Sequence, residues 1–491
     1  MILRLRSIIA ISLILVTGIH GFAQQQRSRS QPVRVIPITG QIRENPKFPP
    51  QVIADLLITG GTVITMDGSR RIIENGAIAV RNGDIVRVGT AAELRGTRAK
   101  QTINATGKVV IPGLINTHTH VPMSLFRGIA DDLDLNDWLT RYIFPAEAKN
   151  VDEAFVRAGT RLGLAEMIRG GTTTYCDMYY FEDAIADETK KAGVRGVLGE
   201  TVIDFPVADN KTWDQAMSYT VRYINKWKND PLIVPAIAPH APYTVSEQHL
   251  REVRSISDRL NAAIVTHVAE TKKERDDILK DHGDTPAKYL NRIGFLSNRV
   301  IAAHAVFVTD EEIDIFKRLG VGVAHNPQSN MKLASGVAPI PQMLQKDVAV
   351  GLGTDGAASN NDLNMWEEMD TAAKLHKEFS GDPKVVNAEQ AFAMATIGGA
   401  RALHLDKLIG SLEVGKRADI AIVDWDTIEQ VPFYNYYSHL VYVTKANNVS
   451  SVVINGRVVM LNRRLLTLNE NAIKIDANTY RRKIIESLRN K

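Results

Sequence analysis

Cysteine is almost absent from this chain of 491 residues, and the single one, Cys176, cannot form a disulfide within the chain. A disulfide framework is therefore excluded as a source of stability. Cys176 stands in an apolar run and is expected to be a small buried residue. Beyond the N-terminal region, no apolar run is long enough to span a membrane. With 44% hydrophobic and 23% charged residues, the composition is that of a globular protein with a large core.

An excess of charge is also missing from most of the chain. The net charge of +4 comes from residues 1–54, which hold seven basic residues and one acidic residue and so leave −2 for the remainder. Because the body of the protein is nearly neutral, the basic pI gives no reason to expect nucleic-acid binding.

The N-terminus has the pattern of a secretory signal peptide. Two arginines precede an apolar run at residues 8–16, and Gly21-Phe-Ala23 is a small-x-small cleavage site ahead of Gln24. This pattern predicts a signal peptide over residues 1–23, export to the periplasm or the extracellular space, and no stable membrane insertion after the leader is removed. No cysteine follows the site, which argues against a bacterial lipoprotein, and a leader retained as a membrane anchor is the alternative. Residues 24–54, rich in Gln, Arg, Ser and Pro, are expected to form an extended linker.

Short alternating apolar runs indicate a small β-domain. Those between residues 55 and 108 are separated by Gly, Asn and Asp, as in hairpins, and similar runs return after residue 405. We therefore predict a β-sandwich built from both chain ends, residues 55–111 and 406–465, followed by a C-terminal helix in residues 466–491. Its expected strands are residues 56–58, 63–65, 77–80, 85–88, 418–423, 441–443 and 449–454.

Between these blocks, apolar runs alternate with amphipathic helical stretches. Eight such repeats predict an α/β protein with a (β/α)8 TIM barrel over residues 112–405. The expected helices include residues 151–169, 246–261 and 310–319, with 363–379 and 388–403 after the last strand. The eight expected strands are residues 109–120, 171–178, 194–201, 233–240, 262–270, 300–307, 321–326 and 349–355.

Polar residues are concentrated where these strands end. Residues two apart on a strand point to the same side, so both imidazoles of His118-Thr-His120 are directed at one point, as a divalent transition metal requires. For this motif alone, a pair of exposed or core-satisfied histidines is the alternative. In such barrels active residues lie at the carboxyl ends of strands, and six of the twelve histidines fall there. The further polar residues at these ends are His240, His267, Glu270, His304, His325 and Asp355.

These strand ends resemble the amidohydrolase superfamily, with His-x-His on the first strand, single histidines on the fifth and sixth, and aspartate on the eighth. Within it, several segments are similar to the branch that contains S-adenosylhomocysteine and 5′-methylthioadenosine deaminases and triazine chlorohydrolases. The resemblance covers nearly all of residues 55–465. The segments are Pro112-Gly-Leu-Ile-Asn-Thr-His-Thr-His120, Leu125-Phe-Arg-Gly-Ile-Ala-Asp-Asp132, Thr266-His-Val-Ala-Glu270 and His325-Asn-Pro-Gln-Ser-Asn330.

The resemblance also implies a metal site. Members with two metals usually carry a lysine on the fourth strand, but residues 233–240 contain none. One divalent metal is therefore expected, held by His118, His120, His267 and Asp355. Zinc suits three nitrogen ligands and one carboxylate, and iron is the alternative.

Three residues are expected to carry the chemistry. Asp355 can take a proton from the attacking water, and His304 can hold the hydroxide or stabilise the developing charge. Glu270, three residues after His267, is placed to protonate a ring nitrogen. A glutamate at this spacing favours deamination over dechlorination, because chloride leaves without needing a proton.

For the far end of the substrate, the resemblance suggests Trp138 as an apolar wall, Glu147 as an acceptor for ribose hydroxyls and His240 as a donor to the purine. Core packing for Trp138 and a solvated helix charge for Glu147 are the alternatives. Arg195, near the third strand, is the one arginine that could hold the carboxylate of an amino-acid substituent.

The expected function is metal-dependent hydrolytic deamination of an aminopurine such as adenosine, 5′-methylthioadenosine or S-adenosylhomocysteine. The alternatives are another ring, of the guanine, pterin or triazine type, or a ligand-binding barrel without catalysis. The expected partner is a small heterocyclic substrate, with neither nucleic acid nor a membrane, and the chain is expected to be a homo-oligomer.

Overall fold

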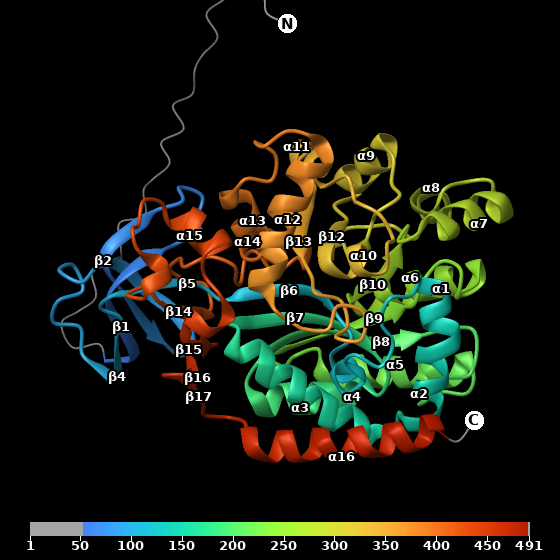
Figure 1. Ribbon diagram of the computed structural model, residues 1–491, viewed down its shortest axis with the longest axis horizontal. Coiled ribbons are helices and arrows are strands. Elements are labelled where there is room, and N and C mark those ends of the chain that lie inside the picture. Colours follow the sequence, from blue (N-terminus) through green and yellow to red (C-terminus); the bar gives the residue numbers. More distant parts are fainter. Residues whose placement is uncertain (1–52, 490–491) are drawn as a thin grey trace, which may run out of the picture. The chain divides into compact units, whose positions relative to one another are not determined.

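The computed structural model of this protein describes residues 53–489 (Figure 1). The predicted signal peptide lies outside the described residues, as does the predicted linker except for its last two residues. The described chain contains a barrel of parallel strands and a second sheet beside it. The strands of that second sheet come from both ends of the sequence, so blue and red strands lie together in Figure 1.

The barrel consists of eight parallel strands that lie side by side in chain order, which confirms the predicted fold class. A hydrogen bond connects the end of the first strand to the segment after the last strand: the Asp355 N–H donates to the His118 carbonyl at 2.9 Å. Beside it, the Asn116 side chain bonds the Thr354 hydroxyl at 2.7 Å. The strands are β6 (Leu114–Thr119), β7 (Thr172–Tyr179), β8 (Arg195–Val202), β9 (Ile233–Pro239), β10 (Ala263–Val268), β11 (Val300–His304), β12 (Gly322–His325) and β13 (Ala349–Leu352).

Helices follow the strands and cover the barrel (Figure 1). The predicted helices at residues 151–169, 246–261 and 310–319 are α3, α6 and α9, each preceded by an Asp, Ser or Thr that favours a helix start. The helices up to the last barrel strand are η1 (Val121–Phe126), α1 (Leu135–Asp137), η2 (Trp138–Ile143), α2 (Phe144–Asn150), α3 (Glu153–Arg169), α4 (Glu182–Ala192), α5 (Trp213–Trp227), α6 (Glu247–Leu260), α7 (Lys272–His282), α8 (Pro286–Arg292), α9 (Asp310–Leu319), α10 (Pro327–Lys332) and α11 (Ile340–Gln345). After it come α12 (Met365–Ser380), α13 (Ala388–Met394) and α14 (Ile397–Ala402).

Two of the predicted boundaries were wrong. The apolar run at residues 109–120 is two strands, β5 (Lys108–Pro112) in the second sheet and β6 in the barrel. Gly113 separates them, and a Cβ atom there would lie 2.1 Å from the Thr173 hydroxyl, so the close approach requires glycine. Residues 388–403 form two helices, α13 and α14, because the chain turns at Thr396, whose ψ of −105° is not helical.

The second sheet has nine strands. It is mixed rather than purely antiparallel, because β1 pairs in parallel with both β4 and β5. β1 also replaces two predicted short strands, with register shifts around Gly61 that bend it. The strands other than β5 are β1 (Ala54–Ile64), β2 (Ile72–Arg81), β3 (Asp84–Thr90), β4 (Ala99–Asn104), β14 (Ile420–Asp424), β15 (Val449–Ile454), β16 (Arg457–Leu461) and β17 (Arg464–Leu465).

This sheet curls so that strands from the two chain ends enclose a core of their own. The Ile85 N–H at the start of β3 donates to the Lys416 carbonyl at 2.8 Å, just before β14. Ile58, Ile78 and Ile422, from β1, β2 and β14, therefore share one buried cluster. The prediction of a β-domain built from both chain ends agrees with these strands, which enclose one core.

The end of the chain departs from the prediction at one element. Residues 441–443 are not a strand, because α15 (Tyr436–Tyr442) runs through them. The Asn435 side chain caps this helix at Ser438 N, and Leu440 and Val441 are buried. The other late elements are η3 (Ile428–Gln430), η4 (Ala446–Asn448) and α16 (Glu470–Arg489), the last being the predicted C-terminal helix.

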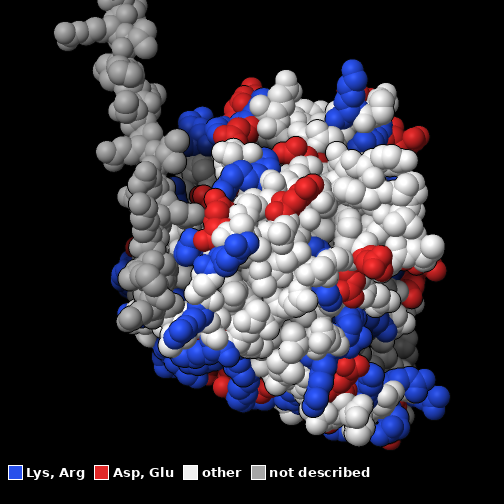
Figure 2. Space-filling model, turned by 90° about the vertical axis from the view of Figure 1, so that its left-hand side faces the viewer, with Lys and Arg blue, Asp and Glu red and all other residues white. Residues whose placement is uncertain are grey.

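The surface carries charges of both signs. On the face that includes the second sheet, basic and acidic side chains are interspersed with broad uncharged areas (Figure 2). Some of these charges are paired, as in Lys100 with Asp55 and Arg417 with Asp84. Over residues 53–489, none of the helices combines the length and apolar character needed to cross a membrane.

Candidate active site

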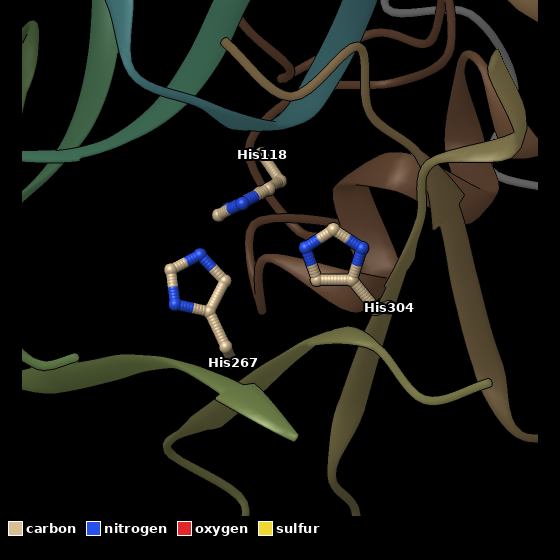
Figure 3. A group of neighbouring side chains, drawn as sticks. All are labelled: His118, His267 and His304. Atoms are coloured by element: carbon tan, nitrogen blue, oxygen red, sulfur yellow. The ribbon is translucent and has the colours of Figure 1, made fainter. Parts of the chain in front are cut away.

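Four histidines meet at the carboxyl end of the barrel strands. His118 and His120 come from the end of β6, His267 from β10 and His304 from β11. The rings of His118, His267 and His304 converge (Figure 3), with one nitrogen of each ring within 4.8 Å of the others. The parallel strands thus bring together histidines that are far apart in the sequence.

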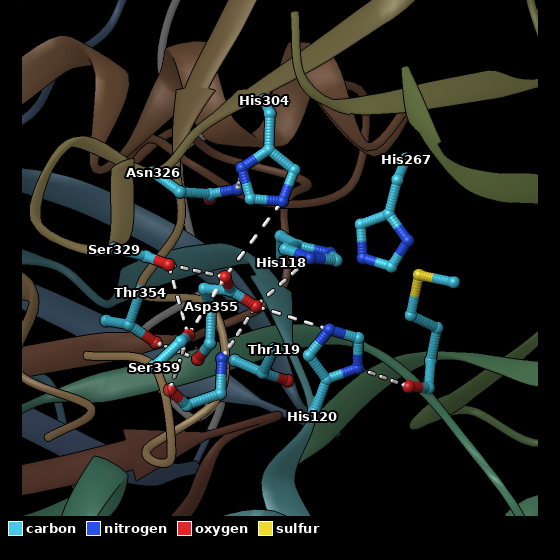
Figure 4. Close-up of polar contacts among 12 residues, drawn as sticks. His118, Thr119, His120, His267, His304, Asn326, Ser329, Thr354, Asp355 and Ser359 are labelled. Carbon is cyan, nitrogen blue, oxygen red and sulfur yellow. Dashed lines mark hydrogen bonds and ion pairs between the residues drawn. The ribbon is translucent and has the colours of Figure 1, made fainter. Parts of the chain in front are cut away.

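Asp355, which follows β13, completes this cluster (Figure 4). Its Oδ1 atom lies 3.4 Å from His118 Nε2 and 3.2 Å from His120 Nε2. Its Oδ2 atom accepts hydrogen bonds from Ser329 at 2.6 Å and Ser359 at 3.1 Å. The serines therefore hold one oxygen and turn the other toward the histidines. Burial raises the pKa of Asp355, but the adjacent imidazoles of His118 and His120 outweigh this effect and hold the pKa well below its usual range.

The side chains of this cluster fit a divalent metal. Both ring nitrogens of His118 are buried without a hydrogen-bond partner, which is an unfavourable state unless the ring ligates something. His120 and His267 donate their Nδ1 protons to the carbonyls of Met178 at 2.7 Å and His240 at 2.8 Å. Their Nε2 atoms are therefore left to ligate, in the arrangement usual for histidine ligands. The sequence-predicted ligands are thus together, and His304 is close enough to join them.

Glu270 faces His304 across the site, with its Oε2 atom 3.8 Å from His304 Nε2. Burial raises the pKa of Glu270, which favours the protonated form that a proton donor requires. His304 Nδ1 donates to Asn330 Oδ1 at 2.8 Å, and this leaves Nε2 free to accept a proton or a hydrogen bond. Glu270 and His304 are therefore adjacent in the site.

A pocket opens beside this cluster, and Glu270, His304 and Asp355 line it. The three residues suggested for the far end of the substrate line the same pocket: Trp138, Glu147 and His240. The further lining residues are His120, Met123, Leu135, Leu139, Ile143, Phe144, Met178, Tyr179, Tyr180, Thr201, Tyr243, His267 and Leu333.

Trp138, Glu147 and His240 each have a distinct environment in this pocket. Trp138 is 6% exposed and belongs to the π-helical turn η2. Glu147, on α2, accepts a hydrogen bond from the Tyr179 hydroxyl at 2.7 Å. Burial raises the pKa of Glu147 to about 7. Burial also lowers the pKa of His240 to about 3, so this imidazole is neutral at ordinary pH.

Arg195 does not belong to the pocket, contrary to the sequence-based suggestion. It is the first residue of β8 and so lies at the amino end of the strand, opposite the pocket. Its side chain is buried and pairs with Asp419, with Nε 2.8 Å from Oδ2. Arg195 therefore joins the barrel to the second sheet and is not available to a substrate.

Sequence reasoning missed four residues that organise the site: Tyr179, Ser329, Asn330 and Ser359. Ser329 and Asn330 stand in the quoted segment that begins at His325, and Tyr179 is the last residue of a barrel strand, so position alone could have drawn attention to them. Ser359 lies in a loop four residues after Asp355, without a distinguishing pattern.

The barrel, the histidine–aspartate cluster and the buried glutamate together define a hydrolase of the metal-dependent TIM-barrel class. The chain belongs to the amidohydrolase family, whose model matches residues 109–459. It is accordingly a hydrolase that acts on carbon–nitrogen bonds.

The chain is also similar to individual relatives and to solved structures. A 5-methylthioadenosine/S-adenosylhomocysteine deaminase of Syntrophobacter fumaroxidans is 47% identical over 408 residues, 83% of this chain and 93% of that protein. A protein of the same name from Aquifex aeolicus is 41% identical over 411 residues, 84% of this chain and 94% of that protein.

Among solved structures, an adenosine deaminase from Xanthomonas campestris with bound zinc has a TM-score of 0.87 and 39% identity, covering 88% of this chain and 99% of that one. An atrazine chlorohydrolase from Arthrobacter aurescens, complexed with zinc, has a TM-score of 0.81 and 26% identity, covering 87% and 99%.

Proposed function

We propose that this protein is a metal-dependent deaminase that hydrolyses the exocyclic C–N bond of an aminopurine nucleoside and releases ammonia. Adenosine, 5′-methylthioadenosine and S-adenosylhomocysteine are the proposed substrates, in line with the names of its relatives. The observation that carries the proposal is Glu270, a buried carboxyl group 3.8 Å from His304 and beside the metal cluster. An amino group leaves a ring only with the help of a proton, and Glu270 is placed to deliver one.

The proposed reaction needs two proton carriers. Glu270 donates its proton to a ring nitrogen, and this makes the amine-bearing carbon electrophilic. Water adds to that carbon, oriented by the free Nε2 of His304, while Asp355 takes a proton from the water. When the C–N bond breaks, the proton on Asp355 leaves with ammonia, and the ring nitrogen returns its proton to Glu270.

We propose one zinc ion as the metal, with iron as the alternative. The ligands would be His118, His120, His267 and Asp355, a donor set that suits zinc. A metal in such a site lowers the pKa of water towards about 7 and so supplies a nucleophile at neutral pH.

The rest of the pocket would select the nucleoside. Trp138 offers an apolar wall, and Glu147 an acceptor for the ribose hydroxyls. Tyr179 occupies only Oε1 of Glu147, which leaves the second carboxylate oxygen for a diol. His240 would bond the purine.

A deamination screen tests the proposal. Purified protein with zinc is supplied with adenosine, 5′-methylthioadenosine, S-adenosylhomocysteine, guanine, a pterin and an aminotriazine, and ammonia is measured. We expect ammonia release from at least one adenine nucleoside. Its kcat/KM should be the highest among the compounds tested. A preference for guanine, the pterin or the triazine would replace the proposed substrate, whereas no turnover with zinc or iron would favour a binding barrel.

We further propose that the chain is exported and works as a homo-oligomer. The N-terminal pattern of residues 1–23 supports export, with cleavage before Gln24. N-terminal sequencing of protein from the source cell should begin near Gln24, in material from outside the cytoplasm. An intact leader on cytosolic protein would contradict this, and light scattering of the purified chain would report the oligomeric state.

A further inference from the structure

Glu274 makes an unusual pair of contacts next to Glu270. It lies in the first turn of α7, where Thr271 is the N-cap and accepts from the Glu274 N–H at 3.1 Å. Its carboxylate is 4% exposed and does not bond the N-cap residue. Instead Oε1 accepts the backbone N–H of Ala269 and Oε2 that of Glu270, each at 2.7 Å. Both oxygens are therefore used to grip the loop that precedes the helix.

Glu312 shows what a glutamate at this helix position ordinarily does. It occupies the same third position of α9, after the N-cap Thr309, and is also buried. Its Oε2 atom accepts the N–H of Thr309 at 2.8 Å, which completes a capping box, and its Oε1 atom accepts from the Thr285 hydroxyl and the Lys288 N–H at the start of α8. The two helices thus begin alike, but Glu274 bonds the residues one and two positions before the N-cap instead of the N-cap itself.

The segment that Glu274 holds has a strained backbone. Ala269 has a φ of +54°, in the left-handed region that residues other than glycine rarely adopt. Its carbonyl accepts from the Phe307 N–H at 2.9 Å, so the turn is fixed to the loop after β11 on one side and to Glu274 on the other. This turn sets the direction in which the side chain of the next residue, Glu270, projects from the backbone. Strained backbone at an active site persists only where its surroundings enforce it.

We propose that Glu274 is a positioning residue for proton transfer: its carboxylate holds the turn at Ala269, and this turn directs the Glu270 carboxyl group toward the ring of the substrate. The inference rests on the proposed function, because it assumes that Glu270 is the proton donor. Glu274 itself does not touch the reacting atoms. Its effect is on the geometry of donation, where small displacements have large consequences for rate.

The test compares Glu274→Gln with Glu312→Gln. Glutamine keeps the shape of the side chain, but it accepts only one of the two N–H groups and presents its own N–H to the other. We expect Glu274→Gln to lower kcat for the aminopurine by roughly 10–100-fold, with KM and bound metal unchanged. The loss should be smaller for the 6-chloropurine analogue, whose leaving group needs no proton. Glu312→Gln, with the same chemical change at the same helix position, should leave kcat and the amine-to-halide ratio unchanged.

A second variant separates positioning from general destabilisation. Glycine adopts a φ of +54° without strain, so Ala269→Gly should restore part of kcat in the Glu274→Gln background. The same glycine should bring no gain in the Glu312→Gln background. If Glu274→Gln alone unfolds, the double variant, with less backbone strain at residue 269, is measured in its place.

Three results of the activity assays would overturn the inference. They are an unchanged kcat in Glu274→Gln, equal losses on the amine and the halide, and no rescue by Ala269→Gly. Hydrogen exchange of the Ala269 and Glu270 amides gives a readout that does not depend on activity, and it should speed up in Glu274→Gln but not in Glu312→Gln. If the unaltered protein deaminates no aminopurine, the proposed function fails, and unchanged exchange in Glu274→Gln would separately refute the role of Glu274 in holding the turn.

Discussion

Arg195 and Asp419 form a buried ion pair that joins the first residue of β8 to the segment entering β14. Arg195 Nε lies 2.8 Å from Asp419 Oδ2, and Nη2 lies 3.2 Å from Oδ1. Asp419 Oδ1 also accepts the Asn455 N–H at 2.7 Å. The pair therefore ties the barrel to two parts of the second sheet, although these segments are more than 200 residues apart in the chain.

Breaking this pair should destabilise the protein without altering its chemistry. Arg195→Met leaves the Asp419 carboxylate buried without its partner, which typically costs about 3–5 kcal/mol of unfolding free energy. Urea unfolding measures the change, and kcat of the remaining folded protein should be unaltered. As a control, Lys272→Ala removes the exposed pair with Asp276 and should cost less than about 1 kcal/mol. A similarly small cost for Arg195→Met would mean that the pair does not join the two parts.

Removal of a single ligand should abolish metal binding and turnover together. His118→Ala, His267→Ala and Asp355→Ala each take one donor from the cluster, and elemental analysis should find little metal in any of them. His282→Ala serves as the control, because His282 lies on α7 and stacks on Tyr289 outside the pocket. Stoichiometric metal in all three ligand variants would show that the ligand set is misassigned.

Glu270→Gln should separate deamination from simple hydrolysis. Glutamine cannot donate a carboxyl proton, and Glu270 is not an expected ligand, so the metal should remain. General acid–base help of this kind contributes roughly 10²–10⁴-fold, and turnover of an aminopurine should fall by about that factor. The fall should be smaller for a chloropurine with the same ring, although ring activation is still lost. Equal losses on amine and halide would reduce Glu270 to a structural role.

Glu147 should make the unliganded protein less stable at high pH. Burial raises its pKa in the folded state to about 7 from the usual 4.5, against the opposing effects of the Tyr179 hydroxyl and of His120. Between these two pH values the native state binds more protons than the unfolded chain, so stability falls as the pH rises through this window and then levels off.

Glu147→Gln removes this dependence. The variant should match the unaltered protein near pH 4 and exceed its unfolding free energy by up to about 3 kcal/mol at pH 8. Urea unfolding at several pH values provides the measurement. A difference between the two proteins that is the same at every pH would contradict the raised pKa. The expected cost of this gain is weaker binding of ribonucleosides, seen as a higher KM.

Much of the site could be predicted because its signals are local. Alternation places His118 and His120 on one side of a strand whatever surrounds it. The eightfold repeat of apolar runs then makes the strand ends neighbours, so His267, His304 and Asp355 could be assigned to one place. Their placement needed only strand order and the rule that active residues lie at carboxyl ends, whereas the ligand set was implied by the resemblance to the amidohydrolase superfamily.

Boundaries and supporting contacts could not be predicted in the same way. The apolar residues continue on both sides of Pro112-Gly113, and strand pairing in the folded chain shows that β5 and β6 belong to different sheets. The apolar Val441 is compatible with either a strand or a helix, and packing in the folded chain favours the helix.

What the sequence by itself determined is therefore the barrel, the family and the polar residues that stand at the ends of the barrel strands. Tertiary structure alone decided which end of a strand Arg195 occupies, that Ser329 and Ser359 hold Asp355, and that Glu274 grips the turn before Glu270. The physical reason is the sequence distance over which each interaction acts. Periodicity reflects only how a residue is placed on its own strand or helix. A hydrogen bond between distant segments depends on how the whole chain packs, and no local pattern encodes it.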